Sequence, residues 1–247
     1  MKQGLFTISE HRPLTENVME LRLRGDTSAV TVPGQFVNIR LDGRFLRRPI
    51  SVCDRAGDTL TLIYKIVGGG TRQMAQMRAG QQLDLLTGLG NGFDPSLAGD
   101  APVLLGGGVG TPPMYWLAKT LIARGMPVRA VLGFNTKSEV FYEKELQALG
   151  AEVTVTTVDG SCGVKGFVTD GLPKQYSYFF ACGPEPMLKA VWKSTGTSGQ
   201  LSFEERMGCG FGACMGCTCR TLTGHKRICK DGPVLRSDEL IWKEERA

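Results

Sequence analysis

The sequence predicts a multidomain α+β protein: a six-stranded antiparallel β-barrel, then an α/β domain with a parallel sheet, then a small C-terminal domain. Three observations support this order. Short β-rich segments fill the first hundred residues, apolar strands alternate with helices from Pro102 onward, and the last segment is rich in Cys and Gly. The 247 residues are long enough for separate cores, with predicted domains at 1–98, 99–200 and 201–247.

The first domain contains six segments with the composition of β-strands, and several alternate apolar with polar residues. Gly, Pro and Asp separate them and few helical patterns intervene, which is typical of a small antiparallel barrel. The predicted strands are Gly4–Ser9, Asn17–Arg24, Gln35–Leu41, Ile50–Cys53, Thr59–Ile66 and Gln82–Leu86.

Strands and helices alternate in the second domain. The predicted strands are PVLLGG from Pro102, VRAVLGF from Val128, EVTVTTV from Glu152 and YFFAC from Tyr178. The predicted helices are Thr111–Ala123, Ser138–Leu149 and Pro184–Lys193, the last with a proline early in its first turn. This alternation predicts a parallel sheet with helices on both faces.

Charge and hydropathy exclude several classes of protein. The net charge is +5, with basic and acidic residues interspersed and no basic run that contains aromatics, so nucleic acid is not an expected partner. No apolar run has the length of a signal peptide core or of a membrane span. We therefore expect a protein of the reducing cytoplasm with no membrane partner, where clustered cysteines bind metal or carry out redox chemistry more often than they form disulfides.

Five of the eight cysteines lie between Met207 and Pro233. Cys209, Cys214 and Cys217 follow C-x4-C-x2-C and Cys229 stands alone, which is the plant-type [2Fe–2S] spacing. Zinc sites usually have a second C-x2-C pair, which is missing here. These four residues are the predicted cluster ligands, with zinc and a disulfide as alternatives and Cys219 as a neighbour that does not bind.

The residues around the cysteines support the same prediction. The small residues of CGFGAC allow the loop to wrap a cluster and to direct backbone N–H groups at the sulfurs. Metal ligation would also supply stability to a segment with little core of its own. Because such a cluster carries one electron at a time, exchange with a two-electron carrier requires a converter, usually a flavin.

Two segments of the barrel are candidates for holding that flavin. In RRPIS, Arg48 can pair with a pyrophosphate and Ser51 can hydrogen-bond an isoalloxazine edge, although a surface arginine at a strand edge is the alternative. In VGGGTRQM, three glycines lead into a short helix with Thr71 as the expected N-cap, which is typical of an anion site.

Two segments of the second domain are candidates for a nicotinamide dinucleotide. LLGGGVGTPPM places glycines between a strand and a helix, although it lacks the G-x-G-x-x-G fingerprint. FFACGPEPML ends the last strand with Cys182, Gly183 and Pro184 at the carboxyl edge of the sheet, where ligands of open α/β sheets bind. A buried cysteine at a strand end is the alternative for this second segment.

In this order, RRPIS, GGGT, GGGVGTPP, ACGPEPM and the cysteine motif resemble the ferredoxin–NADP reductase-like flavoproteins over the whole chain. More closely, they resemble the electron-transfer subunits of type B, NAD-dependent dihydroorotate dehydrogenase, in which isoleucine, here Ile50, replaces an aromatic residue. The resemblance implies FAD contacts from Arg48, Pro49, Ile50, Ser51, Ile63, Tyr64, Lys65, Gly70 and Thr71. It implies NAD contacts from Gly107, Gly108, Gly110, Thr111, Cys182, Gly183 and Pro184, and cluster ligation by Cys209, Cys214, Cys217 and Cys229.

The implied function is electron transfer between NAD(H), FAD, the cluster and the FMN of a separate catalytic subunit that oxidises dihydroorotate to orotate in pyrimidine biosynthesis, with two copies of each chain. No residue is expected to act as a general acid or base, and His11 and His225 are expected at the surface. NADH is preferred because Phe134-Asn135-Thr136-Lys137 replaces the Ser-Arg of NADP-specific relatives, although Lys137 leaves NADPH possible.

The alternatives are a homologous subunit of a ferredoxin-dependent transhydrogenase, sulfite reductase or hydrogenase, a redox-sensing binding module that uses the cluster as a switch, and a zinc-stabilised interaction domain.

Overall fold

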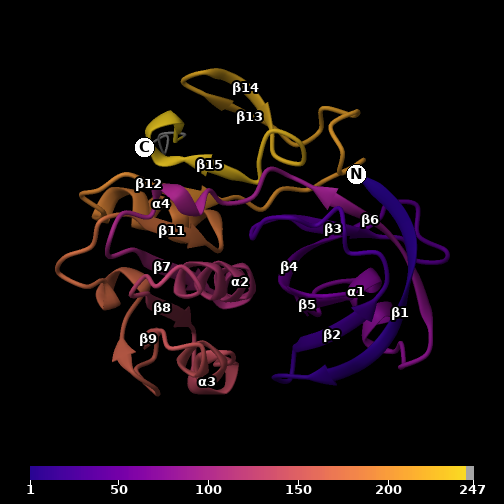
Figure 1. The fold of residues 1–247 in the computed structure, drawn as a ribbon, viewed down its shortest axis with the longest axis horizontal. Helices are drawn as coiled ribbons and strands as arrows, with labels where there is room; N and C mark the ends of the chain where they lie inside the picture. The colour runs from indigo at the N-terminus through magenta and orange to yellow at the C-terminus, as the bar shows by residue number, and fades with distance from the viewer. Residues whose placement is uncertain (243–247) are drawn as a thin grey trace.

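A closed antiparallel barrel forms the first part of the chain (Figure 1). The computed structural model describes residues 1–242. Alternate side chains fill the barrel; on its last strand Leu83 and Leu85 are buried in its core. The strands run in the order β1-β2-β5-β4-β3-β6 and are β1 (Lys2–Pro13), β2 (Val18–Arg24), β3 (Phe36–Ile39), β4 (Arg48–Ala56), β5 (Thr59–Lys65) and β6 (Gln82–Leu89), with helix α1 (Gly69–Ala75) before β6. The prediction of a six-stranded barrel is confirmed.

A seven-stranded sheet forms the second part, in the order β10-β9-β8-β7-β11-β12-β15. Its strands are β7 (Val103–Gly107), β8 (Arg129–Phe134), β9 (Glu152–Thr157), β10 (Val164–Lys165), β11 (Phe179–Cys182), β12 (Gly199–Ser202) and β15 (Val234–Arg236). All neighbours are parallel except β12 and β15. Helices α2 (Thr111–Ile122) and α3 (Glu143–Ala148) pack on one face and α4 (Glu185–Ser194) packs on the other, as predicted.

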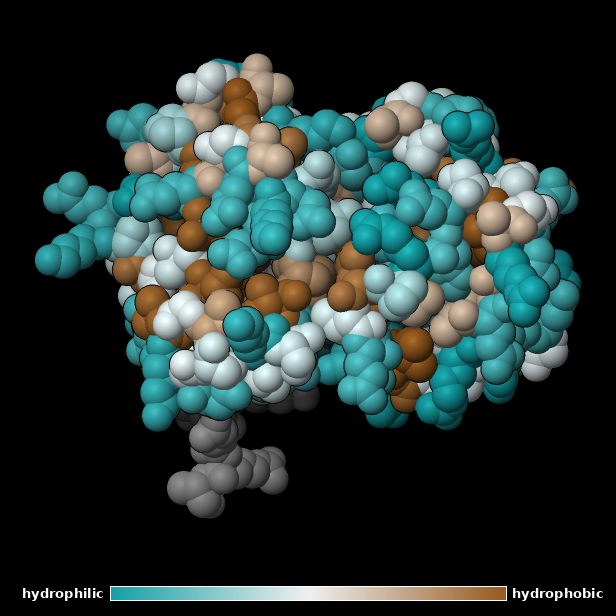
Figure 2. Space-filling model, turned by 90° about the horizontal axis from the view of Figure 1, so that it is seen from below, coloured by the Kyte–Doolittle hydropathy of each residue, from teal (hydrophilic) through white to brown (hydrophobic). Residues whose placement is uncertain are grey.

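Apolar residues also reach the surface of the second part. Seen from below, hydrophobic residues gather in the left half and the middle of the molecule, on the side of the sheet and its helices (Figure 2). Val158 after β9, Val164 on β10 and Phe167 after β10 are among the exposed large apolar residues. Among residues 1–242, no helix is both long enough and apolar enough to cross a membrane.

The predicted helix Ser138–Leu149 is wrong in its first half. A single 3₁₀ turn, η3 (Lys137–Glu139), is followed by the shorter α3, and Tyr142 between them has a left-handed backbone with φ 64°. A bulky residue rarely adopts this conformation. Here the buried Tyr142 hydroxyl donates to Glu20 of the barrel at 2.8 Å, so a contact between the two parts overrides the helical pattern of the sequence.

Helix α2 lies between the sheet and the barrel (Figure 1). One side of the helix packs Met114 and Leu117 into the core that also contains Cys53 of β4, whereas Trp116 joins the buried cluster inside the barrel domain. The ammonium group of Lys119 contacts both carboxylate oxygens of Asp54 at 2.8 and 2.9 Å. These contacts hold the two parts in one orientation.

The last part of the chain lies across the other two (Figure 1). It contains a hairpin of β13 (Thr218–Thr221) and β14 (Gly224–Arg227), and then β15 joins the sheet beside β12. Leu235 and Ile228 are buried against Phe36 and Leu89 of the barrel. The segment therefore obtains its core from its neighbours, which agrees with the expectation that it cannot form one alone.

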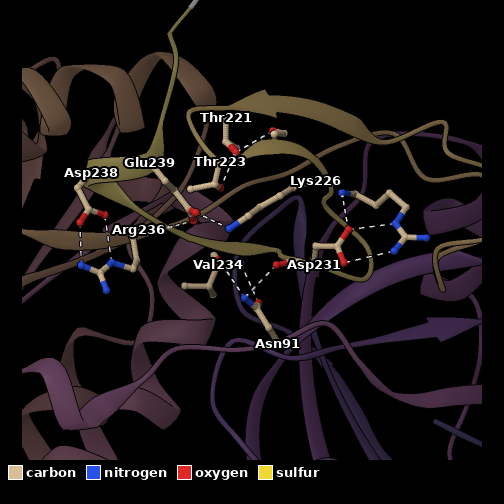
Figure 3. A network of polar contacts seen from close by, with 11 residues as sticks. Asn91, Thr221, Thr223, Lys226, Asp231, Val234, Arg236, Asp238 and Glu239 are labelled. Carbon is tan, nitrogen blue, oxygen red and sulfur yellow. Dashed lines mark hydrogen bonds and ion pairs between the residues drawn. The ribbon is translucent and has the colours of Figure 1, made fainter.

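Asn91, which follows β6, attaches this last part to the barrel (Figure 3). Its side-chain amide donates to the carbonyls of Val234 at 2.7 Å and Asp231 at 3.2 Å, and its Oδ1 accepts from the backbone N–H of Val234 at 3.1 Å. Lys226 pairs with Glu239, and this pair links the hairpin to the turn after β15.

We expect Asn91→Ala to loosen β15 without unfolding the barrel. The substitution removes three hydrogen bonds, which together contribute about 2 kcal/mol. Protection of the Phe203 amide, which donates to Pro233 O at 2.9 Å, should fall about thirtyfold in native-state hydrogen exchange. Asn17→Ala, at an exposed asparagine before β2, is the matched control. Unchanged Phe203 protection in Asn91→Ala would contradict this role.

Candidate functional site

A cleft of about 920 Å³ opens between the barrel and the sheet. Three groups of residues line it. We call the first the barrel side, which consists of Phe36, Arg48–Ser51, Ile63–Lys65, Val67 and Thr71. The second is the sheet side, which consists of Gly107–Val109, Gly133–Asn135, Glu139, Val158, Gly166–Thr169, Pro184, Pro186, Met187 and Ala190. The last part of the chain adds Phe203–Glu205, Met207 and Pro233.

The barrel side exists because β4 and β5 separate at one end. These strands pair from Ala56 and Thr59 only as far as Val52 and Leu62. Beyond that point Arg48–Ser51 pair with β3 alone and Ile63–Lys65 pair with β2 alone. Two strand edges therefore present backbone N–H and C=O groups to the cleft, where a flat polar ring can satisfy them.

The glycine-rich turn before α1 lies beside this opening. The helix begins after Gly68, so the prediction of Thr71 as the N-cap is wrong. Thr71 is the third helical residue, and its hydroxyl accepts from the N–H groups of Val67 at 2.9 Å and Gly68 at 3.1 Å. It thereby holds the turn closed while its side chain lines the cleft.

Two arginines lie over this turn. A Cβ atom at Gly70 would collide with the guanidinium of Arg48, and one at Gly69 would lie 2.9 Å from that of Arg44. Gly70 does not itself line the cleft; its missing side chain makes room for Arg48, which does. Backbone N–H groups and guanidinium groups in one place suit a pyrophosphate.

The sheet side contains only part of the predicted nicotinamide site. Gly107, Gly108 and Pro184 line the cleft, and Gly108 has the left-handed φ of 51°. Gly110 is packed against the carbonyl of Cys182, where a Cβ atom would collide. The remaining residues behind the cleft wall are Thr111, Cys182 and Gly183.

Two of these residues have features that fit the edge of a ligand site. Thr111 is fully buried, and its Oγ1 has no hydrogen-bond partner among residues 1–242. Burial, with the charge of Glu204 adding to it, raises the pKa of the Cys182 thiol to about 12, so this thiol is neutral at physiological pH.

The four predicted cluster ligands form two pairs. The backbone N–H of Cys209 contacts the sulfur of Cys214, and the N–H of Cys214 contacts the sulfur of Cys209, each at 3.4 Å. The N–H of Cys229 contacts the sulfur of Cys217 at 3.4 Å. The prediction that backbone N–H groups point at the sulfurs is confirmed.

This arrangement of sulfurs suits a cluster with two irons, each of which takes two protein ligands. Among residues 1–242, no three His, Cys, Asp or Glu side chains converge as one metal ion would require. Although burial opposes ionisation, the backbone N–H groups of Cys214, Phe211 and Ala213 lower the pKa of the Cys209 thiol to about 6. A cysteine in such a place readily supplies a thiolate ligand.

The cysteine loop is attached to both neighbouring segments. Arg227 donates to Gly212 O at 2.9 Å and pairs with Asp231 at 3.0 Å, so it braces the loop against the turn that carries Cys229. The side-chain amide of Asn38 on β3 donates to Cys209 O at 3.1 Å. Because Asn38 is paired with Pro49 across β3 and β4, one residue joins the cysteine loop to the barrel side of the cleft.

Two expectations about individual residues have different outcomes. His225 is exposed, as expected. The expectation that His11 is simply a surface residue is wrong: it is half-buried, with Nε2 3.0 Å from the Tyr64 hydroxyl and Nδ1 2.8 Å from Met77 O. Burial raises the pKa of Tyr64, so its hydroxyl stays protonated and can donate to His11.

Of the segment Phe134-Asn135-Thr136-Lys137, which the sequence analysis used to favour NADH, the structure places Phe134 and Asn135 in the cleft wall. Several other cleft residues were not predicted from the sequence. Phe203, Glu204 and Pro233 carry no signal in the sequence, since tertiary packing alone brings them to the cleft.

Comparison with known proteins agrees with this architecture. Residues 104–193 match the family model of the oxidoreductase NAD-binding domain. Residues 204–241, which contain all four predicted ligands, match that of the iron–sulfur cluster binding domain of dihydroorotate dehydrogenase B.

Relatives match nearly the full chain. A dihydroorotate dehydrogenase B (NAD(+)) electron transfer subunit from Geobacillus sp. is 44% identical, with 98% of this chain and 99% of the relative covered. The subunit of the same name from Fusobacterium nucleatum is also 44% identical, over 97% and 99%. A solved structure of an NADH-dependent reduced ferredoxin–NADP oxidoreductase superposes with a TM-score of 0.87 at 29% identity, over 97% of this chain and 90% of that one. The chain therefore belongs to the family of electron transfer subunits of NAD(+)-dependent dihydroorotate dehydrogenase B, as its motifs predicted.

Proposed function

We propose that the chain is the electron-transfer component of an oxidoreductase that connects NAD(H), through FAD and a [2Fe–2S] cluster, to a catalytic subunit oxidising dihydroorotate to orotate. The observation that carries the proposal is the meeting of three elements at one cleft: the separated barrel strands, the carboxyl edge of the sheet and the segment leading into the cysteine loop. Bound FAD would exchange a two-electron hydride for single electrons, which such a cluster carries.

The barrel side would hold FAD. The open edges of β4 and β5 offer backbone groups to the isoalloxazine from Arg48–Ser51 and Ile63–Lys65. Arg48, Gly70 and Thr71 would hold the pyrophosphate, because the Arg48 guanidinium lies against Gly70 in the first turn of α1, where the helical N–H groups lack intrahelical acceptors. The 29% identical oxidoreductase is a protein of flavin-based electron bifurcation, which agrees with this assignment.

The sheet side would bind NAD(H). Gly107, Gly108 and Pro184 are accessible in the cleft, and Gly110, Thr111, Cys182 and Gly183 would act from behind its wall. Hydride transfer depends on stacking and distance, so these residues position the nicotinamide and need not move a proton.

Cys209, Cys214, Cys217 and Cys229 would hold the cluster, and the N–H groups at their sulfurs would stabilise its negative charge. Cys219 has a pKa raised by burial and then by the charge of Glu205, and it is assigned no ligand role. The domains would be 1–98 for FAD, 99–200 for NAD and 201–247 for the cluster.

An electron transfer subunit requires a catalytic partner. We assign that partner an FMN, a complex with two copies of each chain, and a cytoplasmic location. The main alternative is that the chain exchanges electrons with a different partner protein, as in the ferredoxin–NADP oxidoreductase structure. The chain is 29% identical to that protein, whereas it is 44% identical to the dihydroorotate dehydrogenase subunit from Geobacillus sp..

The decisive experiment is anaerobic reduction of the chain by dihydroorotate. The chain, loaded with FAD and cluster, should be mixed with the dihydroorotate dehydrogenase catalytic subunit encoded in the same genome. We expect its flavin and cluster absorbance to bleach with dihydroorotate only when that subunit is present, and with NADH in either case.

Control reactions separate the alternatives. Bleaching by NADH and by reduced ferredoxin, with none by dihydroorotate, would move the assignment to another partner. No oxidation of NADH with an artificial acceptor would favour a redox-sensing module. Zinc in place of iron and acid-labile sulfide would favour an interaction domain.

We expect Cys214→Ser to abolish cluster assembly while FAD stays bound, because the cysteine loop and the barrel side are built from different segments. Iron and sulfide should fall from about two of each per chain to a small fraction. Cys219→Ser is the matched control and should keep both. Full iron in Cys214→Ser, or its loss in Cys219→Ser, would show that the ligand assignment is wrong.

A further inference from the structure

The sheet side of the cleft has an apolar surface beyond the glycines. Val158 follows β9 and Phe167 follows β10, and their side chains are 41% and 65% exposed while lining the cleft. Phe134 and Asn135 add the end of β8. Apolar and aromatic side chains at the carboxyl ends of parallel strands suit the flat base of a nucleotide.

One carboxylate lies among these residues. The other charged residues of the cleft, within 1–242, belong to the barrel side or to the last part of the chain: Arg48, Lys65, Glu204 and Glu205. Among the sheet-side residues of the part of the chain that the structure describes, Glu139 is therefore the one that carries a charge. It ends the 3₁₀ turn η3, five residues after β8.

The contacts of Glu139 leave one oxygen available. Its Oε2 accepts from the backbone N–H of Asn135 at 3.1 Å and from the Asn135 side-chain amide at 2.8 Å. Within residues 1–242, Oε1 has no hydrogen-bond donor. The carboxylate is thus held in a fixed orientation with an acceptor free for a ligand.

Lys137, unlike Glu139, lies outside the cleft wall. Its side chain is exposed and does not line the cleft, and its backbone N–H donates to Ser161 Oγ at 2.8 Å. The lysine that left NADPH possible in the sequence is therefore not among the groups that a ligand in the cleft would meet.

We propose that Glu139 selects NAD(H) over NADP(H), because Oε1 accepts a hydrogen bond from the 2′-hydroxyl of the adenosine ribose and the same carboxylate repels a 2′-phosphate. One carboxylate can therefore have two effects: it attracts the ribose diol of NAD(H) through a hydrogen bond, and it repels the 2′-phosphate of NADP(H) by its charge. The inference rests on the proposed function, since it takes the sheet side to be the NAD(H) site.

The test compares two nucleotides that differ only at the 2′ position. Binding of 5′-AMP and of 2′,5′-ADP to the FAD-loaded chain is measured by titration calorimetry, without turnover. We expect the wild type to bind 5′-AMP about 10- to 100-fold more tightly, the range expected from repulsion between two negative charges near a protein surface. Glu139→Gln, which keeps an acceptor for the Asn135 N–H, should reduce this preference below about threefold, and Glu139→Lys should reverse it.

Two control variants accompany the test. Glu152→Gln makes the same charge change at the exposed start of β9, outside the cleft, and should leave the preference unchanged. Lys137→Ala should also leave it unchanged, whereas an effect there would assign selection to the lysine.

The role of Glu139 and the presence of an NAD(H) site on the sheet side can fail separately. An unchanged preference in both Glu139 variants, with 5′-AMP still competing against NADH, would overturn the role of Glu139 and leave the NAD(H) site in place. Failure of 5′-AMP to bind or compete in the wild type would overturn the site itself, and the inference with it.

Discussion

The packing of α2 between the sheet and the barrel is the constraint on which the cleft depends. If α2 covered the sheet alone, the barrel would be free to turn, and the two sides of the cleft would not face each other. Trp116 reaches the buried cluster of the barrel domain, and Lys119 pairs with Asp54 on β4. The core behind α2 is shared, since Cys53 and Ile63 of the barrel pack with Leu117 and Leu121.

The contact between Tyr142 and Glu20 also fixes how the sheet part is oriented relative to the barrel. Glu20 is 1% exposed, and it is satisfied by Arg12 at 3.0 Å, Arg22 at 3.1 Å and Tyr142 at 2.8 Å. A buried carboxylate left without one of these partners would be costly, so the contact disfavours other orientations of the two parts. Burial, with the charges of Cys53 and Glu20 adding to it, raises the pKa of Tyr142 and keeps the hydroxyl a donor. The unfavourable left-handed backbone at Tyr142 is the local cost of this arrangement.

Sequence patterns predicted the elements well because those patterns are local. Alternation on β6 and the short apolar run of β7 each reflect burial within a single strand. The cysteine spacing carried the cluster prediction for a similar reason, since ligand geometry restricts the residues between ligands.

Most of the failures involve partners far away in the sequence, and one has a local cause. Tyr142 breaks a helical pattern for Glu20, and His11 reaches Tyr64 on another strand. Thr71 was placed at the wrong helical position because glycines before it offered several equivalent helix starts. No periodicity could have brought Pro233 or Glu204 to the cleft, since both arrive with a segment whose core belongs to its neighbours.

The attachment of the cysteine loop has a consequence for electron transfer. The loop has little core of its own, so its distance from the cleft is set by the residues that hold it. Asn38 does this from the strand paired with Pro49, and its buried position makes the contact with Cys209 O insensitive to solvent. Asn91 holds the far end of the same segment through Val234. Both asparagines come from the barrel part of the chain, so the barrel positions the cluster loop together with the strands that line the cleft, while β15 attaches the end of the same segment to the sheet.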